Sequence, residues 1–165
     1  MSADEPRSAL PTHWHDAYPK PSTKTPPTIS RQTLLGWITH GKEPGRDFIV
    51  VDLRRSDHTG GFIRGSINLP IESLHLSLPT LHVLFRNAGI KAVIWYCTSS
   101  RGRGNRAAAW FGDYLKQQND SEIQSLALFE GILGWATAGE EYIQHIDEYV
   151  QDAWDPADAT NHTEH

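Results

Sequence analysis

The single cysteine of this 165-residue chain stands where a strand-like run of residues meets a helix-like run. The apolar stretch "KAVIWY" leads into Cys97, and the stretch "NRAAAWFGDYLKQQ" follows a short loop. A thiol at the N-terminus of a helix and beside arginine ionises more readily than an isolated thiol. Because the thiolate is the nucleophilic form, Cys97 is the candidate catalytic nucleophile, and we predict that it is a thiolate at neutral pH.

The loop that begins at Cys97 has the composition of an anion cradle. Its backbone N–H groups have no strand partners and can point inward together with the first N–H groups of the helix. Its small side chains would let an anion approach the backbone closely. The planar fork of Arg103 can bind two oxygens of a tetrahedral anion and stabilise the charge of a transition state. The predicted oxyanion-binding residues are Thr98, Ser99, Ser100, Arg101, Gly102 and Arg103.

A cysteine after an apolar strand also has a plain structural interpretation, because free cysteine often packs as a small core residue. The Cys-x5-Arg spacing between Cys97 and Arg103, at a joint between strand and helix, favours the nucleophile instead. Arg101 and Arg106 stay open between a role in the loop and an exposed surface position.

The composition restricts the class of protein. The length fits one domain, and the formal charge of −5 argues against general nucleic-acid binding. No long apolar stretch indicates a signal peptide or a membrane span, so we expect no membrane partner. One cysteine cannot form an internal disulfide, which fits a reducing compartment. We therefore predict a cytoplasmic and/or nuclear location.

Three segments are distinguished along the chain. Residues 1–27 are rich in Pro, Ser, Thr and Lys and are predicted to form a flexible N-terminal arm. Residues 28–150 are predicted to form the folded domain. Residues 151–165 are predicted to be a polar C-terminal tail.

The stretch "HWHDAY" is an aromatic island within the predicted arm. His13, His15 and Asp16 could contact a metal ion, but three side chains at this spacing are weak evidence, and we predict no metal site. Trp14 and Tyr18 are expected to pin the arm onto the domain instead.

Strand-like and helix-like runs alternate along the domain. Strands are expected at 47–54, a continuous apolar run with β-branched residues, and at the apolar runs 65–71, 91–97 and 125–131. Helices are expected at 28–41 with Ser30 as N-cap, at 73–89 with a break near Pro79, at 105–118, and toward the end of 134–154. The last of these is expected to carry Tyr142, Ile146 and Tyr149 on one face.

This alternation predicts an α/β fold, with a central parallel sheet flanked by helices on both faces. Ligands of such sheets bind beyond the carboxyl ends of the strands. Cys97 lies at that position, at the carboxyl end of an expected strand.

Three ordered motifs resemble those of rhodanese-fold domains. The stretch "IVVDLRRSDHTGGFIRGSINLPI" resembles the first signature of the fold, in which a strand ends in Asp-x-Arg, here Asp52 and Arg54. The stretch "FEGILGWATAG" resembles the closing signature, with Gly131 and Trp135 in place. Between them lies the cysteine loop, and the resemblance covers residues 28–150. Asp52 and Arg54 are expected to tie loops together beneath the site.

The length of the cysteine loop separates two functional types within this resemblance. Sulfurtransferases of the fold usually have a shorter loop that holds a persulfide sulfur. Cell-division-cycle phosphatases and yeast-type arsenate reductases have one more residue, which widens the loop for phosphate or arsenate. Cys97 and Arg103 have the longer spacing. The chain is therefore similar to a small fungal-type member of the Cys-x5-Arg family, and the resemblance implies a cysteine-dependent phosphatase and/or arsenate reductase.

The sequence departs from the resembled pattern at three positions. Phe62 replaces a histidine of the first signature, and Glu130 replaces the first glycine of the closing Gly-Gly pair. Tyr96 replaces the histidine that usually precedes the cysteine and is thought to support the loop and the thiolate. A hydrogen bond from Tyr96 is the expected substitute for part of that support.

Four mechanisms remain open from the sequence. Phosphoryl transfer to Cys97 needs an acid for the leaving group, and Asp57, His58 and Glu130 are candidates. Arsenate reduction needs an external thiol, such as glutathione or a glutaredoxin, because the chain has one cysteine and no tightly bound cofactor is expected. Sulfur transfer from thiosulfate through a Cys97 persulfide, and a non-catalytic anion- or phosphopeptide-binding module, are the alternatives. The expected substrate is a phosphorylated protein or a small oxyanion.

Overall fold

A five-stranded parallel sheet forms the centre of the computed structural model, which describes residues 13–155. The strands stand in the order β1-β6-β5-β2-β4. Their bounds are Thr28–Ile29 for β1, Phe48–Asp52 for β2, Ile67–Asn68 for β4, Ala92–Tyr96 for β5 and Gln124–Leu128 for β6. The expected parallel sheet is confirmed, although β1 was not anticipated as a strand.

The two central strands place the cysteine beside the first signature. Every residue of β2 and β5 is buried, as expected for a parallel sheet that is covered on both faces. The strands are paired so that Asp52 lies opposite Tyr96, the last residue of β5. The carboxyl ends of β2 and β5 are therefore neighbours, and Cys97 follows directly at this edge.

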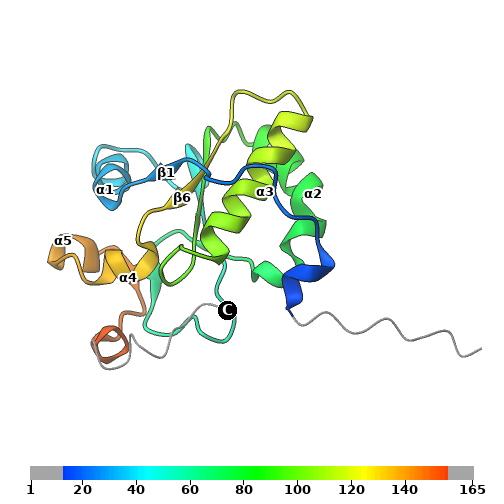
Figure 1. The fold of residues 1–165 in the computed structure, drawn as a ribbon. Helices are drawn as coiled ribbons and strands as arrows, with labels where there is room; N and C mark the ends of the chain where they lie inside the picture. Colours follow the sequence, from blue (N-terminus) through cyan, green and yellow to red (C-terminus); the bar gives the residue numbers. More distant parts are fainter. Residues whose placement is uncertain (1–12, 156–165) are drawn as a thin grey trace, which may run out of the picture.

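Helices cover both faces of the sheet (Figure 1). α2 and α3 lie on one side, and α1, α4 and α5 lie on the other (Figure 1). Their bounds are Arg31–Thr39 for α1, Leu74–Asn87 for α2, Arg103–Gln117 for α3, Gly131–Ala136 for α4 and Glu140–Ile143 for α5. Three 3-10 turns, Trp14–Ala17, Ile71–Ser73 and Gln151–Trp154, complete the described helical segments. This arrangement confirms the α/β class.

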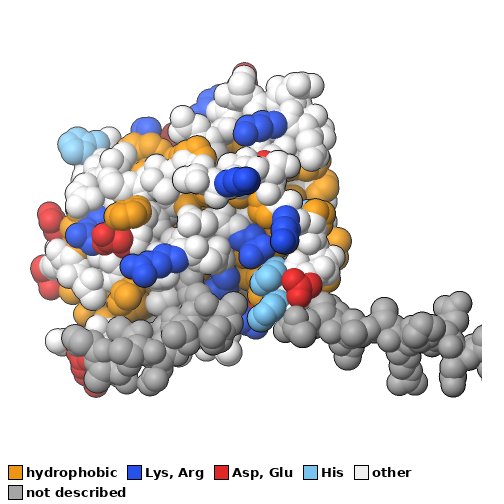
Figure 2. All heavy atoms as spheres, viewed as in Figure 1, with side chains coloured by type: hydrophobic (Ala, Val, Ile, Leu, Met, Phe, Trp, Pro, Cys, Tyr) orange, Lys and Arg blue, Asp and Glu red, His pale blue; other side chains and the backbone are white. Residues whose placement is uncertain are grey.

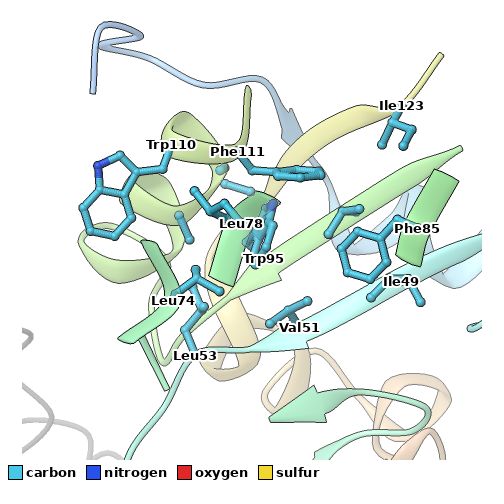
Figure 3. Packing of buried hydrophobic residues seen from close by; sticks show 14 of the residues in the cluster. Ile49, Val51, Leu53, Leu74, Leu78, Phe85, Trp95, Trp110, Phe111 and Ile123 are labelled. Atoms are coloured by element: carbon cyan, nitrogen blue, oxygen red, sulfur yellow. The ribbon is translucent and has the colours of Figure 1, made fainter. Parts of the chain in front are cut away.

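The core between the sheet and the pair α2 and α3 is rich in aromatic side chains (Figure 3). Trp95 of β5 contacts Phe111 of α3 edge-on, with ring centroids 5.5 Å apart, and Phe85 of α2 meets the same ring. Such packing fixes α3 against the strand that leads into Cys97. The orientation of the helix N-terminus toward the cysteine is thus set by the core.

α1 begins as the sequence predicts. The Oγ of Ser30 accepts a hydrogen bond from the backbone N–H of Thr33, which satisfies one of the first N–H groups of the helix. On the same face of the sheet, Trp135 of α4 is fully buried and donates its indole N–H to the carbonyl of Tyr142. Trp135, a residue of the closing signature, therefore packs in the core.

α2 runs through Pro79 without the predicted break. The proline removes one backbone donor, which disfavours a helix interior. Leu74, Leu78 and Phe85 lie on one face of α2 and are all buried against the sheet. Burial of this face outweighs the one lost hydrogen bond, because each buried apolar side chain contributes about 1.5–3 kcal/mol.

The segment after α4 differs from the predicted helix. α5 ends at Ile143, and Ile146–Asp147 forms a strand, β7, that pairs antiparallel with β3, Phe62–Ile63. Glu148 has a φ of 57°, which terminates regular structure there. Ile146 remains buried, but on a strand rather than on a helix face. Two-residue strands leave no periodicity in a sequence, which explains the wrong prediction.

The packed unit extends beyond the predicted limits of 28 and 150. At the N-terminal end, Trp14 and Tyr18 pack against Trp110 of α3, with ring centroids 6.1 and 5.8 Å from that ring, which confirms that they pin this segment. At the C-terminal end, Trp154 is 7% exposed and belongs to the core. Residues 1–12 of the predicted arm and 156–165 of the predicted tail lie outside the described residues.

No helix in the described part of the chain combines the length and apolar character needed to span a bilayer.

Candidate active site

Cys97 lies at the centre of the candidate site, between β5 and α3. The side chain is fully buried, and its Sγ accepts a hydrogen bond from the backbone N–H of Gly104 at 3.2 Å. Gly104 is the second residue of α3, so this donor is one of the N–H groups that a helix leaves without an intrahelical partner. A donor and a helix dipole directed at sulfur both favour the thiolate over the thiol.

The loop turns back on itself at Ser100. Its φ is 59°, the left-handed region that side chains rarely occupy, and such strain is frequent in functional loops. The Oγ of Ser100 accepts a hydrogen bond from the backbone N–H of Cys97 at 3.4 Å. A Cβ at Gly104 would lie 2.8 Å from the Ser100 side chain, which explains the glycine directly after Arg103.

The start of α4 holds the loop from the other side. The backbone N–H groups of Ile132 and Leu133 donate to the carbonyls of Cys97 and Thr98, at 3.1 and 2.9 Å. A Cβ at Gly131 would lie 2.5 Å or less from the same two carbonyl oxygens, so only glycine permits this approach. The closing signature therefore acts as a backbone support for the cysteine loop, a role that the sequence did not reveal.

Arg103 extends from the first position of α3 to Asp57, on the segment after β2. Its Nη1 and Nη2 donate to Oδ1 and Oδ2 of Asp57 at 3.1 and 2.7 Å, a bidentate pair. The Arg103 side chain is 7% exposed and that of Asp57 is 30% exposed. Arg103, the residue predicted to bind the oxyanion, thus begins directly after the cysteine loop, and its guanidinium binds the carboxylate of Asp57.

The guanidinium of Arg103 keeps Asp57 ionised. Burial by itself raises the pKa of this carboxyl, but the hydrogen bonds and charge of Arg103 outweigh burial and lower the pKa from 3.8 to about 2. Asp57 was one of three candidate acids, and it is the one that the structure brings to Arg103. A carboxyl group with so low a pKa is almost entirely deprotonated at neutral pH and has no proton to donate to a leaving group.

The other two candidate acids have different positions. Glu130 is exposed, precedes α4 with a φ of 65°, and binds Arg31 of α1 at 2.7 Å. That left-handed backbone explains why a glycine is usual there. His58 is exposed and lines a cavity of about 200 Å³ together with Asp52 and Asn68. Of the three candidate acids, Asp57 is thus the one that binds the guanidinium of Arg103 through both carboxylate oxygens.

Asp52 and Arg54 form a buried pair beneath the site. Arg54 donates through Nε and Nη2 to the Asp52 carboxylate, with the shortest distance 2.8 Å, and both side chains are 2% exposed or less. Arg54 also donates to the carbonyls of Thr59 and Gly61 at 3.2 and 2.7 Å. These contacts join the end of β2 to the loop that contains Thr59 and Gly61.

Tyr96 does not direct its hydroxyl to the cysteine loop, contrary to the expectation from its position. The hydroxyl oxygen accepts the backbone N–H of Ile63 at 3.2 Å and hydrogen-bonds Ser66 at 2.9 Å. Burial raises the pKa of Tyr96 far above its ordinary value, so the phenol is neutral. The side chain belongs to the core on the α4 side of the sheet and fixes the turn that contains Ser66.

The loop residues divide into a buried and an exposed half. Thr98 and Ser100 are buried and Ser99 is half-buried, whereas Arg101 and Gly102 are exposed. Whether their backbone N–H groups bind an oxyanion stays a prediction. Arg106 is half-buried, with its guanidinium 5.9 Å from the ring centroid of Trp110, so it belongs to the surface of α3.

A groove of about 570 Å³ adjoins the exposed half of the loop. Its walls come from Ser99, Ser100 and Arg101 of the loop, from residues 24–28 before α1, and from the start of α4. Figure 2 shows Lys and Arg side chains spread over this face of the molecule, with acidic side chains at one edge and beside the histidines. The charged residues that line this groove are two cations, Lys24 and Arg101, and one carboxylate, Glu130.

Within residues 13–155, no group of three or more His, Cys, Asp or Glu side chains is arranged to hold a metal ion. His13 and His15 stack on each other, with ring centroids 5.2 Å apart, and His15 interacts with Asp16 at 3.5 Å.

The fold and the site together define a rhodanese-fold domain with a Cys-x5-Arg loop. No family model matches the sequence. Arsenical-resistance protein 2 of Saccharomyces cerevisiae is 32% identical over 116 residues, which cover 66% of this chain and 87% of that protein. The chain belongs to the same family, the rhodanese-fold Cys-x5-Arg proteins that include phosphatases and arsenate reductases.

Solved structures show the same fold. Ygr203w, a yeast protein tyrosine phosphatase of the rhodanese family, has a TM-score of 0.64 and 25% identity, and covers 81% of this chain and 100% of its own. An As-Sb reductase from Leishmania major has a TM-score of 0.54 and 22% identity, and covers 64% of this chain and 72% of its own. The expected rhodanese-like fold is confirmed by these similarities.

Proposed function

We propose that this chain is a cysteine-dependent enzyme that acts on tetrahedral oxyanions, as a phosphatase and/or an arsenate reductase. Cys97 is the nucleophile, Arg103 binds the oxyanion, and residues 98–102 form the cradle. The observation that supports this most strongly is the hydrogen bond of 3.2 Å from the backbone N–H of Gly104 to Sγ. It places the sulfur at the N-terminus of a 15-residue helix, where an anion is stabilised.

Phosphomonoester hydrolysis is the first reaction that this arrangement supports. Sγ attacks phosphorus in line, so the S–P bond forms while the P–O bond breaks and the leaving oxygen takes a proton. Water then attacks the cysteinyl phosphate, which releases inorganic phosphate and restores the thiolate. Positioning and charge stabilisation provide most of the acceleration in such reactions. Proposed substrates are phosphorylated proteins or small phosphate esters.

A specific observation favours arsenate reduction as the second reaction. Arg103 holds Asp57 ionised, with a pKa of about 2, so Asp57 cannot readily protonate a poor leaving group. When the S–As bond to Cys97 forms, an arsenate hydroxyl takes a proton from solvent and leaves as water, so no alkoxide has to leave. Two external thiols then supply two electrons, arsenate becomes arsenite, and the thiols end as a disulfide. An external thiol is required because the sequence holds one cysteine. Glutathione or a glutaredoxin would provide this thiol.

One panel of assays on a single preparation tests the proposal. It compares turnover of p-nitrophenyl phosphate, glutathione-dependent arsenate reduction, and sulfur transfer from thiosulfate to cyanide. We expect activity in one or both of the first two assays and its loss in Cys97→Ser. Arg103→Ala should lower kcat/KM about 10²- to 10³-fold, the usual effect of removing an oxyanion donor.

Two results would contradict this proposal. Thiosulfate turnover well above the other two activities would identify a sulfurtransferase that uses a Cys97 persulfide. Phosphopeptide or anion binding that survives Cys97→Ser, in a protein inactive in all three assays, would identify a non-catalytic binding module. Arg101→Ala is the control for side-chain charge: Arg101 belongs to the proposed cradle through its backbone N–H, which alanine keeps, while its side chain is exposed.

A further inference from the structure

We propose that Asp57 is a positioning residue of the active site, which holds the Arg103 guanidinium in the orientation that binds the oxyanion. The inference rests on the proposed function, because it concerns the same site. The residue type of Asp57 makes it a candidate acid for the leaving group. The role proposed here is a different one.

The contact itself has the geometry of a positioning pair. Two parallel N–H···O bonds of 3.1 and 2.7 Å join the two terminal nitrogens of Arg103 to the two oxygens of Asp57. A single hydrogen bond would let the planar guanidinium rotate about that bond, whereas two fix its plane. The Arg103 side chain is 7% exposed, so little solvent is available to replace the carboxylate.

Asp57 is itself held by its own loop. The backbone N–H of Arg55 donates to Oδ1 of Asp57 at 2.9 Å, so the carboxylate closes a local turn. Arg54 fixes the following residues by donating to the carbonyls of Thr59 and Gly61. The buried pair beneath the site therefore supports Asp57 from one side.

The C-terminal turn supports the same loop from the other side. The indole N–H of Trp154 donates to the carbonyl of Gly60 at 2.9 Å, and the backbone N–H of Val150 donates to the same oxygen at 3.2 Å. A Cβ at Gly60 would lie 2.6 to 2.9 Å from Ala153 and Trp154, so the two segments are in close contact. The carboxylate is thus presented by a braced loop and not by a mobile surface side chain.

This bracing separates the Asp57 contact from an ordinary surface ion pair. Exposed pairs hold their geometry weakly, because two long side chains must be ordered against solvent. Here one partner is a short aspartate on a fixed loop and the other is the first residue of a helix whose N-terminus faces the nucleophile. A shift of about 1 Å in a group that positions a reactant can cost a factor of about 100 in rate. Loss of Asp57 should therefore weaken oxyanion binding although Asp57 carries a negative charge.

Tungstate, a tetrahedral oxyanion that is neither hydrolysed nor reduced here, is the probe for the test. Its binding is measured as protection of Cys97 against iodoacetamide, in wild type, Asp57→Ala and Asp57→Asn. The matched control is Glu72→Ala, because Glu72 is 31% exposed and its carboxylate pairs with Arg55 of the same loop. Circular dichroism and thermal unfolding establish that each variant is folded.

We expect the tungstate concentration for half-protection to rise about tenfold or more in Asp57→Ala. The rise should be smaller in Asp57→Asn, which retains one acceptor oxygen, and should be absent in Glu72→Ala. The alkylation midpoint in pH without tungstate should not rise, because Gly104 still donates to Sγ. A purely structural role would instead lower stability without this selective loss of anion affinity.

Three outcomes would overturn the inference. Equal protection in wild type and a folded Asp57→Ala would show that Arg103 needs no carboxylate. Tighter tungstate binding in both Asp57 variants would show that Asp57 competes with the anion for the guanidinium. No protection of the wild type would contradict the proposed function itself, and is thereby distinguished from the other two outcomes.

Discussion

Two aspartate–arginine pairs involve the segment that follows β2, and they differ in burial and in reach. Asp52 and Arg54 belong to one strand end, are 2% exposed or less, and bind further carbonyls of their own loop. Asp57 and Arg103 join two segments, and the Asp57 side chain is 30% exposed. The Asp52–Arg54 pair holds the loop after β2 in place. The Asp57–Arg103 pair depends on that loop, because the loop positions the Asp57 carboxylate at the candidate site. The chemical type of a pair therefore does not determine its role, whereas burial and connectivity do.

Breaking the buried pair should have the largest effect on stability. Arg54→Ala leaves the Asp52 carboxylate buried without its cation, and this should lower the free energy of unfolding by about 3–5 kcal/mol. Urea denaturation followed by tryptophan fluorescence measures the change. If the unfolding free energy fell by less than about 1 kcal/mol, the Asp52–Arg54 pair would contribute no more than an ordinary surface ion pair. The difference in role between this pair and the Asp57–Arg103 pair would then not be supported.

The backbone support on the opposite side of the cysteine loop comes next. Gly131→Ala brings a Cβ to 2.5 Å or less from the carbonyl oxygens of Cys97 and Thr98, at a φ of 57°. We expect a loss of about 1–3 kcal/mol in unfolding free energy, the usual cost of such backbone strain, and a lower kcat. Gly89→Ala is the control, because Gly89 also has a positive φ but no atom within 4 Å of the added Cβ. Equal effects of the two substitutions would assign the cost to φ alone.

The pair of Asp57 and Arg103 should contribute less to stability than the buried pair, and its contribution should depend on pH. The pKa of Asp57 is lowered from 3.8 to about 2 in the folded protein, so its ionised form stabilises the fold above pH 4. This stabilisation is lost as the pH falls from 4 toward 2, where the carboxyl becomes protonated in both states. Wild type should therefore lose more unfolding free energy than Asp57→Asn over this range, by up to about 1 kcal/mol. Parallel curves for the two proteins would show that the pair adds no stability.

Arg101 should give the smallest effect. It is exposed and lines the groove beside the loop, so Arg101→Ala should change the unfolding free energy by no more than about 0.5 kcal/mol. Turnover of p-nitrophenyl phosphate should also change little, in contrast to Arg103→Ala. A loss in Arg101→Ala comparable with that in Arg103→Ala would mean that both arginines of the loop bind the oxyanion.

The sequence predicts the parts of the site that are close together in the chain. Cys97, the loop after it and Arg103 fall within one strand–loop–helix unit, whose periodicity and spacing are visible in the residues. The Asp52–Arg54 pair was predictable for the same reason, since both residues end one strand. The α/β class follows from the alternation of apolar runs and helical patterns.

Contacts between distant segments were not predictable in the same way. Asp57 is 46 positions from Arg103, and the sequence offered His58 and Glu130 as equally plausible acids. The backbone donors of α4 carry no side-chain signal, although the small residue Gly131 marks the place where two backbones approach. The sequence does not indicate the partner of the Tyr96 hydroxyl, because the Ile63 N–H that it accepts is 33 positions away in the chain.

The hydrogen bond from Trp154 to Gly60 has a practical consequence for expression design. If the chain were cut at residue 150, where the sequence motifs end, and a tag or fusion partner were joined there, Trp154 would be lost. Its indole N–H would then no longer hold the loop that carries Asp57. Such a protein could retain its sheet and its cysteine and still give misleadingly poor anion affinity. Fusion junctions should therefore be placed after residue 155.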